Sequence, residues 1–145
     1  MFFGKHFLRL SETNQLTLPS NYQVAMSNPT YLTQGFDRNL LFLSQQTFNA
    51  IYSHVTMTSI SDPLARLMSR LFLAAATEIA IDGSGQIELP PGLCEYAGLG
   101  KEIIMVGQGD YSEIWSPALW QNQMDNLNDH EANAHRFEKF HISLT

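Results

Sequence analysis

Hydrophobic and polar residues alternate with a period of two in two short stretches near the N-terminus, 7–10 and 16–18. In an extended strand this period places the apolar side chains on one face, so each stretch predicts a half-buried strand. A turn rich in Ser and Asn separates the two stretches, and Pro19 ends the second strand and opens a short helix. A second strand pair is predicted over 31–33 and 40–43.

The same series of patterns returns 71 residues later. The segment LRLSETNQLTLPSNY (8–22) aligns with IAIDGSGQIELPPGL (79–93), with apolar residues on apolar residues and Pro on Pro. One residue out of phase, LFLSQQTF (41–48) aligns with EIWSPALW (113–120). The chain therefore contains two copies of one unit.

The second copy predicts the same elements as the first. Ser44 and Ser116 have the position of helix N-caps. A short helix is predicted over 91–97, with Gly98 as its left-handed cap, and GQGD (107–110) has the composition of a hairpin turn. The predicted strands of this copy are 78–81, 87–89, 103–106 and 113–115.

A helix is predicted between the two units. Asp62 is its N-cap and Pro63 its first residue, and apolar residues then recur at helical spacing. Arg66 and Arg70 lie on the side away from this apolar stripe, with Asp62 placed to support Arg66. The preceding SHVTMTSIS (53–61) is predicted as a loop, and the polar tail from residue 128 as helical at first. The stripe consists of Leu64, Leu67, Met68, Leu71, Phe72 and Ala75.

These patterns predict an α+β protein. Four short strands and one small helix cannot bury both faces of the strands alone, so we expect the two units to interlock around a pseudo-two-fold axis into one β-rich core. The side chains expected between them are Leu10, Leu18, Ile81 and Leu89. The predicted divisions are a first module at 5–47, a loop and connector helix at 48–75, a second module at 76–119, and a C-terminal helix and polar tail at 120–145.

Composition narrows the possible partners. The formal net charge is −6 with only eight Lys and Arg residues, whereas nucleic-acid-binding proteins usually have a basic face. Cys94 is the only cysteine; we expect it to be a buried small side chain, and the cysteine usage favours the cytoplasm. The longest apolar run, 71–76, is too short to span a membrane, and Lys5, His6 and Arg9 interrupt the N-terminus where a signal peptide needs an apolar core.

Nothing in the sequence predicts an enzyme. His130 and His135 are five residues apart, so they project from different sides of a helix and do not form the i, i+4 pair of a helical zinc site. The chain has neither a nucleophile elbow nor a phosphate-binding glycine loop. We therefore expect no catalytic residue, metal, cofactor or small-molecule substrate.

Nearly the whole chain resembles the MraZ family of bacterial transcriptional regulators. The most specific stretches are MFFGKH (1–6), LTLPSNY (16–22), the long run from Arg70 to Ser116 that contains AIDGSGQIELPPGLCEYAGLG, and the terminal LW (119–120). The resemblance implies two AbrB-like swapped-hairpin modules that form one β-barrel-like core with flanking helices. It also implies a ring-shaped homo-oligomer, cytoplasmic and nucleoid-associated, that binds direct repeats in double-stranded DNA upstream of a division and cell-wall gene cluster.

The resemblance also points to site residues. Each module of the family displays an Asp-x-x-x-Arg motif on its hairpin, and the arginine approaches DNA. This chain has Asp82-Gly83-Ser84-Gly85-Gln86 in the second module and Ser11-Glu12-Thr13-Asn14-Gln15 in the first, so glutamine replaces both arginines. We expect Lys5 and Arg9 on the preceding strand, together with Asn14, to compensate in part for the two missing arginines. The DNA-binding residues expected from the resemblance are Lys5, Arg9, Ser11, Asn14, Gln15, Asp82 and Gln86.

Two other functions stay open from the sequence. Glutamine carries no charge and releases no counterion, so a ring-forming interaction protein that has lost DNA binding is one alternative. An antitoxin-like AbrB relative is the other, although the tail is too short and too mixed in composition for an arm that wraps a toxin.

Overall fold

A computed structural model describes residues 1–26, 29–57 and 60–140 of the chain. Its strands form one six-stranded sheet and one two-stranded sheet, and all neighbouring strands are antiparallel. The larger sheet has the order β1 (Lys5–Arg9), β7 (Glu102–Gly107), β8 (Tyr111–Trp115), β4 (Leu40–Ser44), β3 (Thr30–Gln34), β5 (Thr77–Ile79), and the smaller sheet pairs β2 (Gln15–Thr17) with β6 (Gln86–Glu88).

Strands of one repeat pair with strands of the other. The cross-repeat pairs are β1 with β7, β3 with β5, β4 with β8 and β2 with β6. These pairs obey the pseudo-symmetry of the sequence, because β5 is the second copy of β1 and β7 the second copy of β3. The two units therefore share one α+β core. The ladder found in the described residues has β1 and β5 as its edges and does not close on itself.

The core contains most of the side chains that the repeat predicted. Leu10, Leu18 and Leu89 are all buried. Ile81 is only partly buried at the margin of the same core, so its predicted full burial was wrong. The reason is local: β5 ends at Ile79, and Ile81 already lies in the approach to the following turn.

Two short helices cover this core, each after a proline. α1 (Ser20–Ala25) contributes Tyr22, which is fully buried, stacks on Phe2 and accepts a hydrogen bond from the Ser112 hydroxyl. Burial raises the pKa of the Tyr22 phenol.

The second of these helices, α4 (Pro91–Ala97), confirms the predicted boundaries. It ends at Gly98, whose φ of 62° is the left-handed conformation predicted for its cap. Cys94 is buried as expected, and burial raises the pKa of its thiol.

α2 (Gln45–Met57) and α3 (Pro63–Phe72) form a helical arm. Both predicted N-caps are confirmed, because the Ser44 hydroxyl accepts the N–H of Thr47 and the Asp62 carboxylate accepts the N–H of Leu64. The predicted loop over 53–61 was wrong as far as residue 57, because α2 continues to there; 58 and 59 lie outside the described residues. Phe48, Ile51 and Val55 recur at helical spacing and pack in one apolar cluster with residues of α3. This packing outweighs the low helix propensity of the Ser and Thr residues.

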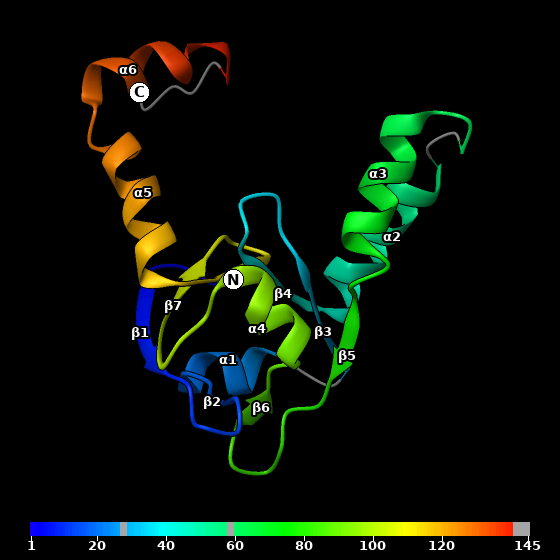
Figure 1. Ribbon diagram of the computed structural model, residues 1–145, viewed down its shortest axis with the longest axis vertical. Helices are drawn as coiled ribbons and strands as arrows, with labels where there is room; N and C mark the ends of the chain where they lie inside the picture. Colours follow the sequence, from blue (N-terminus) through cyan, green and yellow to red (C-terminus); the bar gives the residue numbers. More distant parts are fainter. Residues whose placement is uncertain (27–28, 58–59, 141–145) are drawn as a thin grey trace.

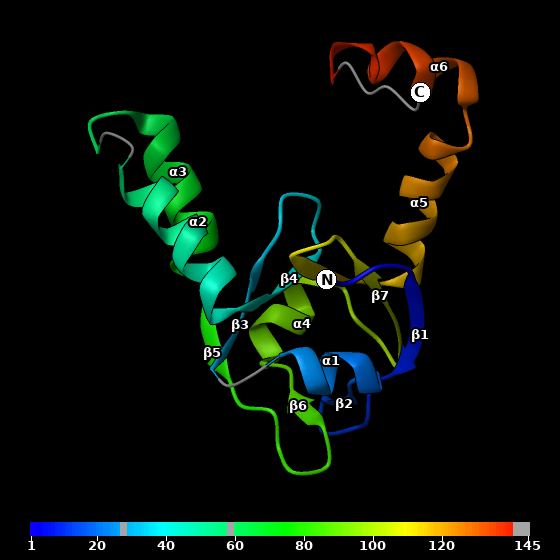
Figure 2. The ribbon, with the colours of Figure 1, turned by 180° about the vertical axis from the view of Figure 1, so that it is seen from behind.

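A second arm consists of α5 (Pro117–Leu127), α6 (His130–Arg136) and a 3-10 turn, η1 (Glu138–Phe140). The Ser116 hydroxyl accepts the N–H of Leu119, which confirms the predicted cap. The helical start predicted for the tail is also confirmed. Of the residues described, none in α5 or α6 is buried. Figures 1 and 2 show both arms projecting from one end of the core, while the β1–β2 and β5–β6 turns lie at the opposite end.

Along the described residues, no helix combines the length and the apolar character that a membrane crossing requires.

Leu89 provides a test of the shared core. Its side chain is 0% exposed, so Leu89→Ala leaves a cavity that both repeats line. We expect the free energy of unfolding to fall by about 2–5 kcal/mol, measured by urea denaturation. Val24→Ala is the control, because Val24 is 88% exposed and its loss should change stability by less than about 0.5 kcal/mol. Equal effects of the two substitutions would contradict the shared core.

Candidate nucleic-acid interface

The turn between β1 and β2 is closed by Ser11. Its hydroxyl accepts the backbone N–H of Gln15 at 2.9 Å and that of Thr13 at 3.3 Å. The backbone N–H of Ser11 donates to the carbonyl of Gln15 at 2.9 Å. Ser11 therefore organises the turn through its own hydrogen bonds, and the side chains of Ser11, Thr13 and Gln15 are all exposed.

The turn before β6 is closed in the same way by Asp82. One carboxylate oxygen accepts the backbone N–H groups of Gln86 and Ser84, both at 2.9 Å, and the Ser84 hydroxyl at 2.8 Å. The N–H of Asp82 also donates to the carbonyl of Gln86 at 3.0 Å. Asp82 thus takes the position that Ser11 has in the first turn, and three donors occupy one of its oxygens.

These bonds change the acidity of Asp82. The N–H of Gln86, followed by the Ser84 hydroxyl, holds the pKa of the Asp82 carboxyl below its ordinary value of 3.8. Because the side chain is exposed, desolvation opposes ionisation only weakly, and the hydrogen bonds stabilise the ionised form. The carboxylate therefore stays charged and bound to its own turn at neutral pH.

Each turn contains one left-handed residue at the same position of the repeat, Asn14 with a φ of 59° and Gly85 with a φ of 78°. Gly85 is also close to Gln23, whose amide donates to the carbonyl of Leu18 at 2.6 Å. A Cβ on Gly85 would lie 2.2 Å from the Gln23 side-chain carbonyl carbon. Position 85 therefore requires glycine for two reasons: its backbone is left-handed, and Gln23 leaves no room for a Cβ.

The two turns are bonded to each other through β2 and β6. The N–H of Leu18 donates to the carbonyl of Gly85 at 3.0 Å, and the N–H of Leu89 donates to the carbonyl of Asn14 at 2.8 Å. These residues are equivalent in the repeat, so the two bonds are a symmetric pair. The paired strands hold both turns side by side at one end of the molecule (Figure 1).

Alternation along β2 and β6 gives this two-stranded ribbon two different faces. Leu16 and Ile87 face each other in the core, at 0% and 1% exposure. The outer face, which we call the ribbon face, pairs Gln15 with Glu88 and Thr17 with Gln86. The Gln86 amide donates to the Thr17 hydroxyl at 3.2 Å.

The two cations expected on β1 lie at opposite ends of that strand. Arg9 is at the turn end, opposite Glu102. Lys5 is about 13 Å away at about 3.3 Å per residue, with its ammonium 6.0 Å from the centre of the Trp120 ring on the second arm. The structure therefore brings Arg9, but not Lys5, towards the turns.

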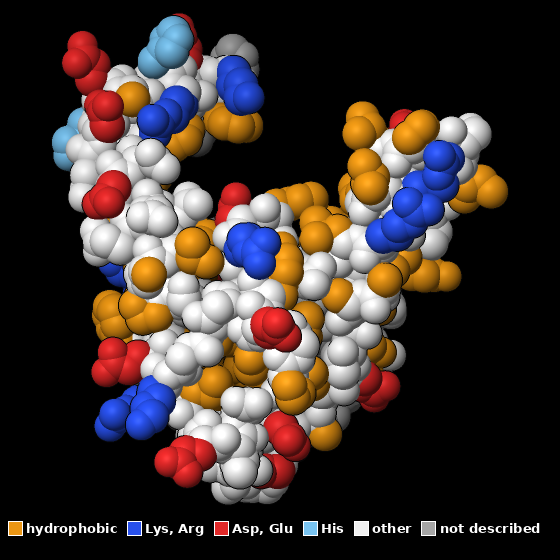
Figure 3. All heavy atoms as spheres, in the orientation of Figure 1, with side chains coloured by type: hydrophobic (Ala, Val, Ile, Leu, Met, Phe, Trp, Pro, Cys, Tyr) orange, Lys and Arg blue, Asp and Glu red, His pale blue; other side chains and the backbone are white. Residues whose placement is uncertain are grey.

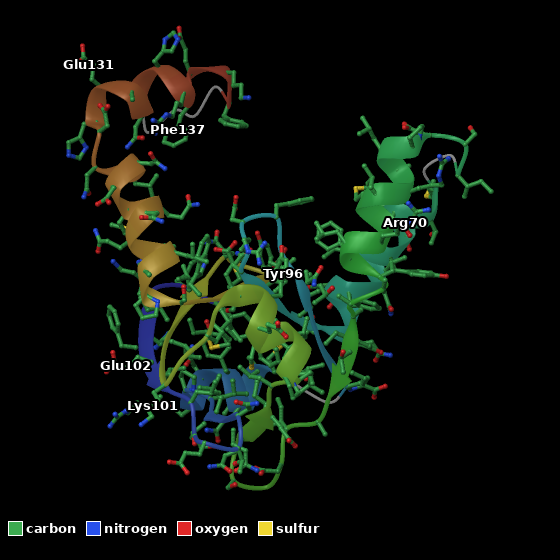
Figure 4. All side chains as sticks on the ribbon, viewed as in Figure 1. Arg70, Tyr96, Lys101, Glu102, Glu131 and Phe137 are labelled. Carbon is green, nitrogen blue, oxygen red and sulfur yellow. The ribbon has the colours of Figure 1, made fainter. Side chains whose placement is uncertain are left out.

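Lys101 is a residue that sequence reasoning missed. Its carbonyl accepts the N–H of Leu10 at 2.7 Å, so its backbone adjoins the start of the first turn. Figure 4 shows Lys101 and Glu102 near the turn end of β1. The pairing of β1 with β7 could have identified Lys101, but that pairing connects distant parts of the sequence and has no local signal.

Charge at the turn end is mixed. Figure 3 shows acidic and basic side chains together there. With four carboxylates against two cations, this surface does not have the strongly basic character typical of nucleic-acid-binding proteins. The charged residues of this end are Arg9, Glu12, Asp82, Glu88, Lys101 and Glu102.

A metal-binding cluster is absent from the part of the chain that the structure describes, where no three His, Cys, Asp or Glu side chains converge. His135 instead contacts Glu138 at 4.0 Å on the surface of the second arm.

Comparison with known proteins places this architecture in a family. Residues 72–140 match a family profile described as "MraZ protein, putative antitoxin-like". The chain is 31% identical over 129 residues to the transcriptional regulator MraZ of Herpetosiphon aurantiacus, covering 89% of this chain and 90% of that protein. The chain belongs to the MraZ family. The MraZ protein of Thermomicrobium roseum is 38% identical over 127 residues, covering 88% and 89%, and that of Paenarthrobacter aurescens 34% over 132 residues, covering 91% and 90%.

Gly85 and Gly83 form a matched pair of substitutions in one turn. Gly85→Ala introduces a side chain at a φ of 78° and against Gln23, whereas a Cβ on Gly83 meets nothing within 4 Å. We expect Gly85→Ala to lower the free energy of unfolding by at least about 1–2 kcal/mol, and Gly83→Ala to change it by less than about 1 kcal/mol. Thermal and urea unfolding measure both. If Gly85→Ala were harmless, the described turn geometry would be wrong.

Asp82 and Ser11 close equivalent turns, but only Asp82 titrates. Since the pKa of Asp82 is lowered by folding, its charged form stabilises the protein above about pH 3.8, and this contribution is lost as pH falls through the folded pKa. We expect Asp82→Ser, which copies the first turn, to reduce stability near pH 7 and to have a smaller effect near pH 3. Urea unfolding at both pH values measures this.

The control for that experiment is Ser11→Ala, which removes an uncharged cap. Its cost in stability should be the same at both pH values. A cost of Asp82→Ser that did not depend on pH would show that hydrogen bonds to the carboxylate do not favour its ionised form.

Proposed function

We propose that the chain is a DNA-binding transcriptional regulator that contacts double-stranded DNA through the ribbon face and its two turns. The observation that carries this proposal is the symmetric joining of the two turns across β2 and β6, which presents two equivalent polar tips at one end of the molecule. The name of its relatives, transcriptional regulator MraZ, supports the same function.

The shape of the ribbon suits this role, because a two-stranded β-ribbon fits the major groove. Gln15 and Gln86 reach base edges there, where a glutamine amide can pair with the N6 and N7 positions of adenine. Ser11 and Asn14 donate hydrogen bonds to the nearby DNA backbone, and Arg9 and Lys101 contact phosphates at the edge of the groove. Asp82 acts indirectly by holding its turn, and Lys5 lies too far along β1 to take part.

Binding of this kind depends little on salt. Each neutralised phosphate contributes about 0.9 to the log–log slope of affinity against salt, and only Arg9 and Lys101 supply cations at the turn end. Glu12 and Glu88 oppose the approach of DNA. The protein therefore relies on base contacts more than on charge.

Assembly supplies the affinity that one copy lacks. We propose a homo-oligomeric ring of two-module subunits, with 5–47 and 76–119 as AbrB-like swapped-hairpin modules, that places several ribbons on direct repeats upstream of its own genes. Exposed apolar side chains such as Phe7 (75%) and Leu64 (73%) are consistent with contacts between copies. Closed symmetry also covers the free edges of β1 and β5. Such a regulator acts in the cytoplasm, associated with the nucleoid.

Restoring cations to the turns tests the proposal. In register, Gln15 faces Glu88, whereas Gln86 faces the uncharged Thr17. An arginine at 15 therefore gains a cross-strand carboxylate partner, and an arginine at 86 does not. We expect Gln86→Arg to tighten binding to the upstream DNA of the protein's own operon and to steepen its salt dependence by about 0.9 per subunit contact, with a smaller effect of Gln15→Arg.

The measurement is fluorescence anisotropy at two salt concentrations, with Gln121→Arg, exposed on α5 of the second arm, as the charge control. Tight binding by the unmodified protein that neither turn substitution alters would place the DNA surface elsewhere. No binding by the unmodified protein, but binding by Gln86→Arg, would favour a ring that has given up DNA. If neither the unmodified protein nor Gln86→Arg binds the DNA, and the protein instead binds a small toxin encoded beside its gene, the antitoxin-like function is favoured.

A further inference from the structure

Charge is distributed unequally along the chain. Residues 76–119 contain seven Asp and Glu and a single cation, Lys101, whereas residues 48–75 contain Arg66, Arg70 and one acid, Asp62. Both arginines are exposed on α3, and their spacing of four residues places them about 6 Å apart along the helix axis. In Figure 3 they form a continuous basic stripe on the first arm.

The stripe borders a hollow between α2 and α3 of about 370 Å³. Its floor is apolar and its rim carries two hydroxyl groups and two guanidinium groups. Among the described residues that line it, none is acidic. They are Val55, Thr56, Ile60, Ala65, Arg66, Ser69 and Arg70.

Neither guanidinium is neutralised within the described part of the chain. Arg66 donates one N–H to the carbonyl of Ile60 at 2.8 Å, which fixes it at the rim and leaves other donors free. The predicted support of Arg66 by Asp62 was wrong: no ion pair joins them, because the carboxylate caps α3 at the N–H of Leu64. Arg70, labelled in Figure 4, forms neither a hydrogen bond nor an ion pair with another described residue.

We propose that this hollow binds a phosphate group through Arg66 and Arg70, with the hydroxyl of Ser69 as a further donor. Two adjacent guanidinium forks match an anion that has several acceptor oxygens and up to two charges. A carboxylate, with two oxygens and one charge, satisfies only one fork. The phosphate can belong to a nucleic-acid backbone or to a free phosphorylated small molecule, and the experiment separates the two sources.

This site is independent of the proposed ribbon face. The arm projects from one end of the core and the turns lie at the other (Figure 1). Loss of one function therefore leaves the other measurable.

The first test uses pyrophosphate as the probe and calorimetry on the full chain. We expect Arg70→Gln to weaken pyrophosphate binding at least about tenfold, equivalent to about 1.4 kcal/mol, and the double substitution Arg66→Gln and Arg70→Gln to abolish it. Arg70→Lys, which keeps the charge but loses the fork, should give an intermediate affinity. Lys139→Gln is the matched control, since it removes one exposed cation from the other arm, and it should leave binding unchanged.

The second test uses duplex DNA of arbitrary sequence with the same variants. If Arg70→Gln weakens duplex binding and lowers its salt slope by about 0.9, the phosphate belongs to a nucleic-acid backbone. If only pyrophosphate binding responds, the site takes a free phosphorylated molecule. Pyrophosphate and duplex binding that are both absent, or both indifferent to Arg70→Gln in a variant with unchanged thermal stability, would overturn the inference. If binding to the operon DNA changes with Gln86→Arg but not with Arg70→Gln, the proposed function stands and the operon DNA does not use the phosphate site.

Discussion

The exchange of strands between the two repeats is the constraint on which the rest of the structure depends. Each repeat supplies strands too short to bury an apolar face alone, and every strand of one repeat pairs with a strand of the other. Leu16 and Ile87 meet where β2 and β6 cross the pseudo-two-fold axis, both almost completely buried. Neither module has a complete core of its own, so the two turns that β2 and β6 carry are fixed relative to each other.

The candidate site shows two chemical solutions to one geometric requirement. Ser11 closes its turn with a hydroxyl, and Asp82 closes the equivalent turn with a carboxylate. The residues at the left-handed position differ as well, Asn14 in one turn and Gly85 in the other. The backbone path is conserved between the copies while the charge is not, so the pseudo-symmetric ends present different electrostatic surfaces to any partner.

Local patterns were enough to predict most of the elements, but not the pairing of the strands. The period-two stretches, the serine and aspartate caps and Gly98 each act within a few residues, so the sequence reveals them directly. The exchange of β1 to β7, which brings Lys101 beside Leu10, joins distant segments and leaves no such signal. Two errors also have local causes: Ser and Thr in 53–57 concealed the end of α2, and Ile81 lies just beyond the strand whose alternation predicted its burial.

The same exchange has a consequence for synthesis on the ribosome. β1 is synthesised before its partner β7, which lies more than ninety residues later in the register that joins Arg9 to Glu102. Contacts of such long range slow folding. The strand edges of the nascent first repeat therefore stay unpaired, and can pair with a neighbouring nascent chain of the same kind, until the second repeat has been made.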